Sequence, residues 1–390
     1  MVRDVDSLQT MILPIEVLTS EQASAWTQFR TGNPALYSPY FHIGYTQLLG
    51  RLSGDVHVLV VTKNANPIAF LPFQAQINAT GKVGFARPVG APMTDYHGFI
   101  CAPETSFNAH TILKQARFGA YHFSTLIDTG SMLAGYVRDK TPCTVMDISM
   151  GAEDWRAARD SSYRRHLKSN RRRIRKSEAH GPRRFEFNST DQTVFDQLTQ
   201  WKREKFDESG KYDVLSADWT RALLSELWRR GQDADLRTDM HCMYFGDRLA
   251  AVDLGLSDGT TFHSWMVAYN SEYYTLAPGI QLLEALIDEA QNLGYQRIDL
   301  GEGVDGYKRH YASENVSVSS GFIAANGPAA ALSKLYGGIE NFGENKLGKT
   351  KLGKLGRIPG KARRRYTQIS ACDASLSGRS KAMLRAVKGG

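Results

Sequence analysis

The spacing of apolar and polar residues is most regular between Met240 and Lys308. Three β-rich runs come first, and Asp/Gly pairs at Gly246-Asp247 and Asp258-Gly259 separate them. Asp/Gly pairs between such runs favour hairpins. The runs cover residues 242–245, 249–256 and 261–269.

After Pro278 the apolar residues recur every three to four positions, and this spacing is typical of an amphipathic helix. Gly294 marks its end, and a short buried strand is expected at 297–300. The predicted order is therefore hairpin, long strand, helix, strand.

The same spacings predict a comparable order of elements elsewhere in the chain. We expect residues 1–13 to be a frayed start and residues 20–30 to form a helix with Ser20 as its N-cap. Further helices are expected at 42–52, 105–118, 191–206, 217–230 and 328–342, and strands at 56–61, 68–76, 124–127, 143–148, 184–188 and 316–325.

Both halves thus follow a similar order of elements, which predicts two similar mixed α/β folds in tandem, each a central sheet flanked by helices. We place the domains at 1–155 and 156–326, with a ligand crevice between them. Residues 327–390 become rich in Lys, Arg, Gly and Ser and are expected to form a basic, largely disordered tail.

Length and composition limit the number of domains and the kinds of partner that we expect. A length of 390 residues favours two domains, and a net charge of +8 favours an anionic substrate or partner. Four scattered cysteines without ligand spacing predict neither a disulfide framework nor a metal site. No apolar run reaches transmembrane length, and we expect a cytoplasmic protein.

The predicted helix start at Ala277, Pro278, Gly279, Ile280 and Gln281 is the best candidate for binding. The first backbone N–H groups of a helix hold phosphate without needing a charged side chain. Proline also begins many helices that bind no ligand. The prediction of phosphate binding therefore depends on the order of strands around this helix.

The candidates for acid–base chemistry are a histidine and three carboxylates, Asp253, Asp299 and Glu302. Asp253 interrupts an apolar strand, where an unpaired carboxylate is costly, and Glu302 follows the strand at 297–300. His263 has a suitable intrinsic pKa, although a histidine on an apolar strand is more often a core residue. Asp253 pairing with an arginine and Glu302 lying on the surface remain equal alternatives.

Two residues beyond that strand and one basic run complete the candidates. Lys308 could hold a phosphate or an oxyanion, and Tyr307 could protonate a leaving thiolate. The run at 163–184 is dense in Lys and Arg, including Arg164 and Arg171. It is either a solvated helix face or a clamp for phosphates.

The chain resembles the GNAT acyltransferase superfamily, and most closely its CelD-like branch of polysaccharide-biosynthesis acetyltransferases, which is related to the FemAB peptidyltransferases. The resemblance rests on Ala277-Pro278-Gly279, on IDLGEG at 298–303, on Tyr307-Lys308, on the basic stretch at 163–181 and on Thr94-Asp95-Tyr96-His97. The usual phosphate loop of the superfamily, Arg/Gln-x-x-Gly-x-Gly/Ala, is absent.

This resemblance implies transfer of an acyl group from acetyl-CoA or another acyl-CoA to an amine or hydroxyl by direct attack. It implies a sugar, sugar nucleotide or polysaccharide precursor as acceptor. It also places Asp95, Tyr96 and His97, with Arg164 and Arg171, at the acceptor. Two rivals remain: a FemAB-like transferase using aminoacyl-tRNA, and a non-catalytic GNAT module binding RNA or a membrane surface.

Overall fold

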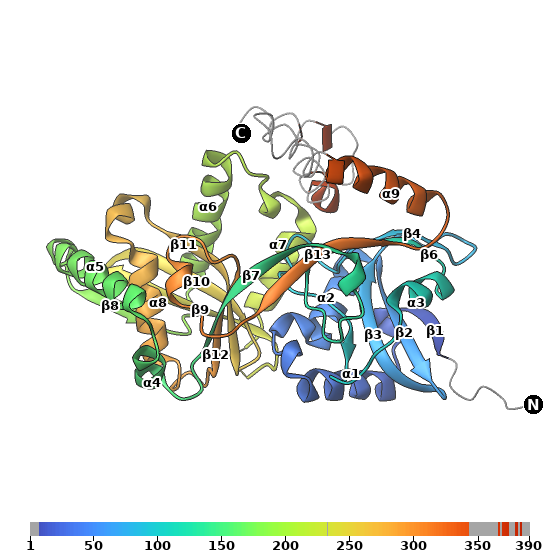
Figure 1. Cartoon of the computed structure of the whole chain (residues 1–390). Helices are drawn as coiled ribbons and strands as arrows, with labels where there is room; N and C mark the ends of the chain where they lie inside the picture. Colours follow the sequence, from blue (N-terminus) through green and yellow to red (C-terminus); the bar gives the residue numbers. More distant parts are fainter. Residues whose placement is uncertain are drawn as a thin grey trace, which may run out of the picture. The chain divides into compact units, whose positions relative to one another are not determined.

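The computed structural model describes residues 8–231, 233–342, 366, 369–373, 379, 380 and 383, and these form two compact units. The first unit takes residues up to 140, residues 216–223 and residues from 318 onward. The second takes residues 141–215 and 224–317. Figure 1 shows the elements of both units along the chain.

The first unit is built from two groups of strands and their helices. One sheet has the order β1-β2-β3-β5, and strands β4, β6 and β13 are neighbours in a second. The elements are β1 (Gln9–Pro14), α1 (Ser20–Gly32), α2 (Ile43–Ser53), β2 (Val56–Lys63), β3 (Asn66–Gln74), β4 (Val83–Ala86), β5 (Ile100–Cys101), α3 (Ala109–Gln115), β6 (Phe118–Leu126), β13 (Ser317–Ala324) and α9 (Gly327–Phe342).

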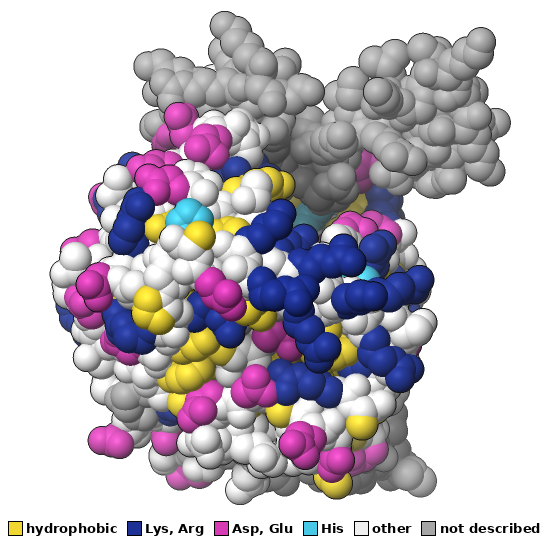
Figure 2. Space-filling view, turned by 90° about the vertical axis from the view of Figure 1, so that its left-hand side faces the viewer, with side chains coloured by type: hydrophobic (Ala, Val, Ile, Leu, Met, Phe, Trp, Pro, Cys, Tyr) yellow, Lys and Arg dark blue, Asp and Glu magenta, His cyan; other side chains and the backbone are white. Residues whose placement is uncertain are grey.

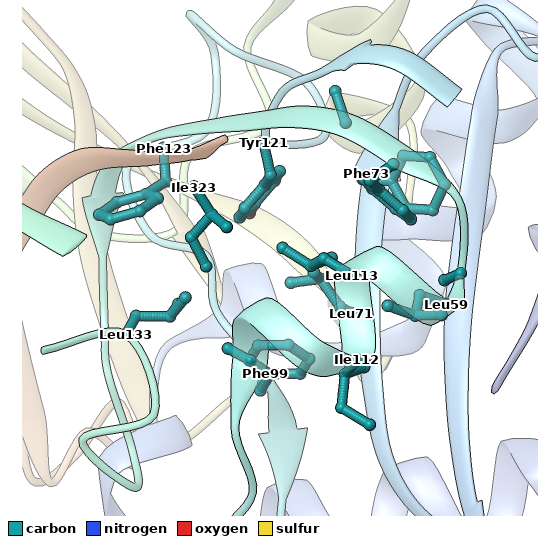
Figure 3. Close-up of a cluster of buried hydrophobic side chains, with 14 of the residues drawn as sticks. Leu59, Leu71, Phe73, Phe99, Ile112, Leu113, Tyr121, Phe123, Leu133 and Ile323 are labelled. Carbon is teal, nitrogen blue, oxygen red and sulfur yellow. The ribbon is translucent and has the colours of Figure 1, made fainter. Parts of the chain in front are cut away.

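A cluster of buried apolar side chains joins several elements of this unit. Leu71 from β3, Leu113 from α3 and Ile323 from β13 point into it, and all three are fully buried (Figure 3). Burial on this scale is the main force that stabilises such a unit.

The second unit carries six neighbouring strands in the order β7-β12-β11-β10-β9-β8. Helices α6 and α8 pack on β10 and β11. The elements are β7 (Val137–Asp147), α4 (Ala152–Ala157), α5 (Ser161–Ser177), β8 (Arg183–Glu186), α6 (Gln192–Glu208), α7 (Asp218–Trp228), β9 (Arg237–Phe245), β10 (Arg248–Ser257), β11 (Thr261–Tyr269), α8 (Pro278–Glu289) and β12 (Arg297–Glu302), and the division between the units falls within β7 and α7.

The predicted mixed α/β class, with sheets flanked by helices, is confirmed, and so is the order hairpin, long strand, helix, strand in β9 to β12. The helix expected at 328–342 is α9. Almost all of the predicted basic tail after residue 342 lies outside the described residues. Within the described part of the chain, no helix is both long and apolar enough to cross a membrane.

Three local predictions were wrong. The expected frayed start contains β1, which pairs with β2 from Gln9 to Pro14. The cap of α1 is Thr19 instead of Ser20, because Thr19 and Gln22 form a reciprocal capping box. The helix expected at 105–118 is limited to α3, because Arg117 adopts a left-handed φ of 61° and β6 begins at the next residue.

Candidate active site

The candidate site lies where two parallel strands of the second unit separate. β11 and β12 pair only from Thr261/Arg297 to His263/Asp299, although β11 continues to Tyr269. A cavity of about 410 Å³ opens beside the unpaired part of β11. Its lining comes from β10, β11, β12, α5, α8 and the segments next to them, namely Arg173, Asp253, Ser264, Val267, Tyr269, Tyr274, Thr275, Ala277, Pro278, Gly279, Ile280, Leu283, Leu300 and Tyr307.

A β-bulge decides which side chains of β11 line this cavity. Leu254 of β10 pairs with Met266, whereas Gly255 pairs with Ser264, so Trp265 is an extra residue on β11. The extra residue reverses the alternation along the strand. As a result Ser264 and Val267 line the same cavity, although an uninterrupted strand would direct them to opposite faces.

The start of α8 forms one wall of the cavity. Ala277 adopts a left-handed backbone (φ 50°, ψ 57°) and Pro278 is the first helical residue. The N–H groups of Ile280 and Gln281 both donate to the Ala277 carbonyl, at 3.1 and 3.3 Å. Proline has no N–H, so Gly279 carries the one amide of this turn with no backbone acceptor among the described residues. The predicted phosphate site therefore offers fewer free backbone N–H groups than an ordinary helix start.

Gly279 leaves open space on the cavity side. A Cβ atom built on it would meet only Val267 Cγ1, at 3.9 Å, which is ordinary van der Waals contact. Its backbone is outside the left-handed region, so larger side chains are compatible with the helix. This wall can therefore accept either a ligand or a substituted side chain.

Asp253 is the carboxylate that the structure brings to the cavity. It is 5% exposed, and burial raises its pKa to about 7. The Ser264 hydroxyl donates to both carboxylate oxygens at 2.9 Å, which favours the ionised form and works against burial. The nearby Lys202 and His263 act in the same direction as Ser264. A carboxyl group with a pKa near neutrality is suited to proton transfer.

Tyrosine rings line much of the remaining cavity. Tyr307 is 37% exposed, and burial together with the charge of Asp253 raises its pKa to about 12. Its hydroxyl therefore keeps its proton at neutral pH and can donate it. Tyr274 is 69% exposed, so an aromatic face meets solvent at this cavity.

Helix α5 brings Arg173 to the cavity, and a buried network fixes that helix against α8. Tyr163 of α5 and Tyr311 both donate to the Glu284 carboxylate, at 3.0 and 2.8 Å. Arg156 of α4 pairs with the same carboxylate at 3.2 Å. Burial, followed by the charge of Glu284, raises the pKa of both tyrosines, so both stay protonated donors.

Several predicted residues lie away from the cavity. His263 is fully buried, with Nδ1 3.5 Å from Asp299 Oδ2, and does not line it. Gln281 is also buried, and its amide donates to the Leu276 carbonyl at 3.0 Å. Glu302 is exposed at the end of β12. Lys308 Nζ donates to the carbonyl groups of Leu300 and Glu302 at 2.6 and 3.1 Å, so it holds the end of β12.

The residues predicted to contact an acceptor are dispersed. Arg164 and Arg171 are exposed on α5. In the first unit Asp95 is half-buried, whereas Tyr96 and His97 are only 1% and 4% exposed. Burial lowers the pKa of His97 to about 3, and neither ring nitrogen has a hydrogen-bond partner within the described residues.

Sequence reasoning missed Arg173 and Ser264. The buried positions of α5 are Tyr163, Asn170 and Ser177, at intervals of seven residues, and Arg173 lies three residues from Asn170 on the same side. That spacing could have separated Arg173 from Arg171. No local signal marks Ser264, because its orientation depends on the bulge at Trp265.

No group of three or more His, Cys, Asp or Glu side chains that could hold a metal ion occurs within the described residues. Asp253, Tyr307 and the start of α8 are the candidates for chemistry at this cavity because they line it.

Residues 162–309, from α5 to just beyond Tyr307, match a family model described as an acetyltransferase (GNAT) domain. The match includes every residue that lines the cavity. This part of the chain is therefore similar to a GNAT acetyltransferase domain, as the sequence resemblance implied. No curated protein matches the chain.

Solved structures resemble most of the chain at low identity. A tandem GNAT protein from the clavulanic acid biosynthesis pathway is 12% identical, with a TM-score of 0.49 over 83% of this chain and 99% of its own. FemX is 9% identical, with a TM-score of 0.48 over 80% of this chain and 96% of its own. The C-terminal domain of a putative lysylphosphatidylglycerol synthetase from Agrobacterium fabrum is 13% identical, with a TM-score of 0.42 over 80% and 94%. At these values the likenesses carry no information about the reaction.

Proposed function

We propose that this protein transfers an acyl group, acetyl in the simplest case, from acyl-CoA to an amine or hydroxyl group in the cavity at the start of α8. The observation that carries the proposal is the position of Asp253, a carboxyl group with a pKa of about 7 that lines a cavity within the matched GNAT domain. Half of such groups are ionised at neutral pH, so Asp253 can act as a base there.

The donor proposal rests on the wall formed by α8. The Gly279 amide, the open space beside it and the cationic Arg173 suit the phosphates of an acyl-CoA. We assign this wall, from Ala277 to Ile280, to the donor. An acyl-CoA donor would also place the enzyme in the cytoplasm.

The proposed reaction is a direct transfer without a covalent enzyme intermediate. The acceptor nitrogen or oxygen attacks the thioester carbonyl carbon while Asp253 takes its proton, and the C–S bond breaks as the tetrahedral intermediate collapses. Tyr307 is placed to return a proton to the leaving thiolate, because its raised pKa keeps the hydroxyl protonated. The products are the acylated acceptor and free CoA.

We further propose a saccharide acceptor. The support for it is the resemblance of IDLGEG (298–303) and Tyr307-Lys308 to the CelD-like branch of polysaccharide acetyltransferases. The same resemblance would bring Asp95, Tyr96 and His97 to the acceptor.

The test is release of free CoA from acetyl-CoA in the presence of a panel of amino sugars and neutral sugars. Wild-type protein is expected to release CoA with at least one acceptor, and Asp253→Asn to lower kcat about 10²–10⁴-fold. The substitution keeps the size of the side chain and removes only its basicity. Acceptor-dependent release that survives in Asp253→Asn would contradict the assigned base, and no release with any acceptor would contradict the proposed reaction.

A further inference from the structure

The solvent face of α5 carries an unbalanced row of positive charge. Its cations are Arg164, Arg165, Lys168, Arg171, Arg172, Arg175 and Lys176, and all seven are exposed. At 100° per residue they fall within an arc of roughly 140°, and from first to last they extend about 18 Å along the helix axis. We call this arc the cationic face of α5. Figure 2 shows Lys and Arg side chains gathered on the side of the molecule where Figure 1 places α5.

Neighbouring acidic groups do not neutralise this face. The helix contains no Asp or Glu. Ion pairs within the described part of the second unit use other cations, such as Arg156, Arg203 and Arg248. The helix cap Asp160 lies near Arg165, but its carboxylate accepts the backbone N–H of Tyr163 at 2.9 Å. Like charges held this close together repel one another, so a bound anionic ligand would reduce the repulsion between these cations.

The cationic face adjoins the cavity. Arg173, which lines the cavity, lies one position after Arg172 and one turn before Lys176 on the same helix. A long ligand with one group in the cavity can therefore continue along the cationic face of α5. The Glu284 network joins α5 to α8, whose first residues line the cavity.

We propose that the acceptor is a linear acidic glycan, whose carboxylate or phosphate groups bind the cationic face of α5 while one of its hydroxyl or amine groups enters the cavity. The inference rests on the proposed function, since it names the acceptor of that reaction. Arg predominates on the face, and its planar fork binds carboxylate and phosphate in a bidentate manner.

The same residues argue against two other polyanions. No large apolar side chain of α5 is exposed, so the face offers no aromatic ring on which a single-stranded nucleic acid could stack its bases. A base of a duplex would have to unpair before it could enter a cavity of about 410 Å³. The apolar side of the helix, including Tyr163 and Leu167, packs inside the protein and cannot enter a membrane.

The experiment compares binding by wild-type protein with two quadruple variants of equal charge. The face variant carries Arg164→Gln, Lys168→Gln, Arg171→Gln and Arg175→Gln. The control variant carries Arg203→Gln, Lys205→Gln, Arg229→Gln and Arg248→Gln, four cations of the second unit that already have acidic partners. The probes are an oligogalacturonate, a phosphorylated mannan, a neutral malto-oligosaccharide of matched length, a 20-base-pair RNA duplex and vesicles with 30% anionic lipid.

We expect at least one of the two acidic glycans to bind wild-type protein and the control variant similarly, and the face variant about tenfold or more weakly. Affinity should fall as salt rises, with a shallower slope for the face variant. The two acidic probes decide between carboxylate and phosphate. Equal binding of the neutral glycan, equal loss in the control variant, or tighter face-dependent binding of RNA or vesicles would overturn the proposal.

Stabilisation by acetyl-CoA separates this inference from the reaction itself. If acetyl-CoA stabilises all three proteins but neither acidic glycan binds the face, the acceptor class is wrong and the donor assignment stands. If an acidic glycan binds the face but acetyl-CoA stabilises none of them, the proposed transferase reaction is wrong.

Discussion

Asp253 lies on an apolar strand where its ionisation is opposed by burial and supported by Ser264, Lys202 and His263. The balance leaves its pKa near 7, which is the property that a base needs at neutral pH. Sequence reasoning identified Asp253 because a buried carboxylate on an apolar strand is costly. It could not identify Ser264, since the residue reaches the carboxylate only through the bulge in β11.

The rate of acyl transfer should depend on this pKa. We expect kcat/KM to rise about tenfold per pH unit below 7 and to level off above it, because only the ionised Asp253 accepts a proton. Ser264→Ala removes the hydroxyl proton that both oxygens of Asp253 share and that favours ionisation, so the rising limb should move to higher pH. Initial rates between pH 5 and 9 measure both effects, and an unmoved limb in Ser264→Ala would contradict the assignment.

The raised pKa of Asp253 should also make the free energy of unfolding depend on pH. The unfolded chain releases the Asp253 proton near pH 3.9, whereas the folded protein keeps it up to about pH 7. The folded state thus binds more protons in this window, and the free energy of unfolding falls as pH rises through it. Asp253→Asn cannot ionise and escapes this loss. Its gain in Tm over wild type should be larger at pH 8 than at pH 4.5, and an equal gain at both would count against the raised pKa.

The helices and strands around the site determine the position and size of the cavity. Pairing between β11 and β12 stops after three residue pairs, which makes room for the cavity, and α8 begins at its edge. The sequence predicted the order of these elements because the spacing of apolar residues, Pro278 and Gly294 are local signals. It did not predict where the pairing stops, because strand separation depends on packing between residues far apart in the chain.

The Glu284 network should matter more for stability than the surface pair that shares its arginine. Arg156 pairs with Glu284, whose side chain is 12% exposed, and with Asp288, whose side chain is 63% exposed. Glu284→Ala removes the carboxylate that Tyr163, Tyr311 and Arg156 share, leaves Arg156 with Asp288 as its carboxylate partner, and should cost about 2–3 kcal/mol. Asp288→Ala should cost less than about 1 kcal/mol. Urea unfolding of both variants makes the comparison, and equal losses would mean that the network does not anchor α5.

At the scale of the whole molecule, the mixed α/β class was predictable, because it follows from the local order of elements. The similarity of residues 162–309 to a GNAT domain was predictable from the resemblance of motifs such as IDLGEG at 298–303. The composition of the compact units was not, since residues 216–223 and those after 317 belong with the N-terminal part of the chain. Nothing in the spacing of apolar residues near these positions signals a return to another unit. The predicted boundaries at 155 and 326 remain predictions, as do the roles of Asp95, Tyr96 and His97.

Thermal unfolding with and without acetyl-CoA tests most directly whether acyl-CoA binds the wall formed by α8. Acetyl-CoA at a hundred times its Kd should stabilise wild-type protein by about 2.7 kcal/mol. Gly279→Asn should keep this rise in Tm and Gly279→Asp should lose it, because the two side chains have nearly the same size, their Cβ atom would meet only Val267 Cγ1 at 3.9 Å, and only the aspartate brings a negative charge beside the donor phosphates. No rise in wild-type protein, or an equal rise in Gly279→Asp, would contradict the account.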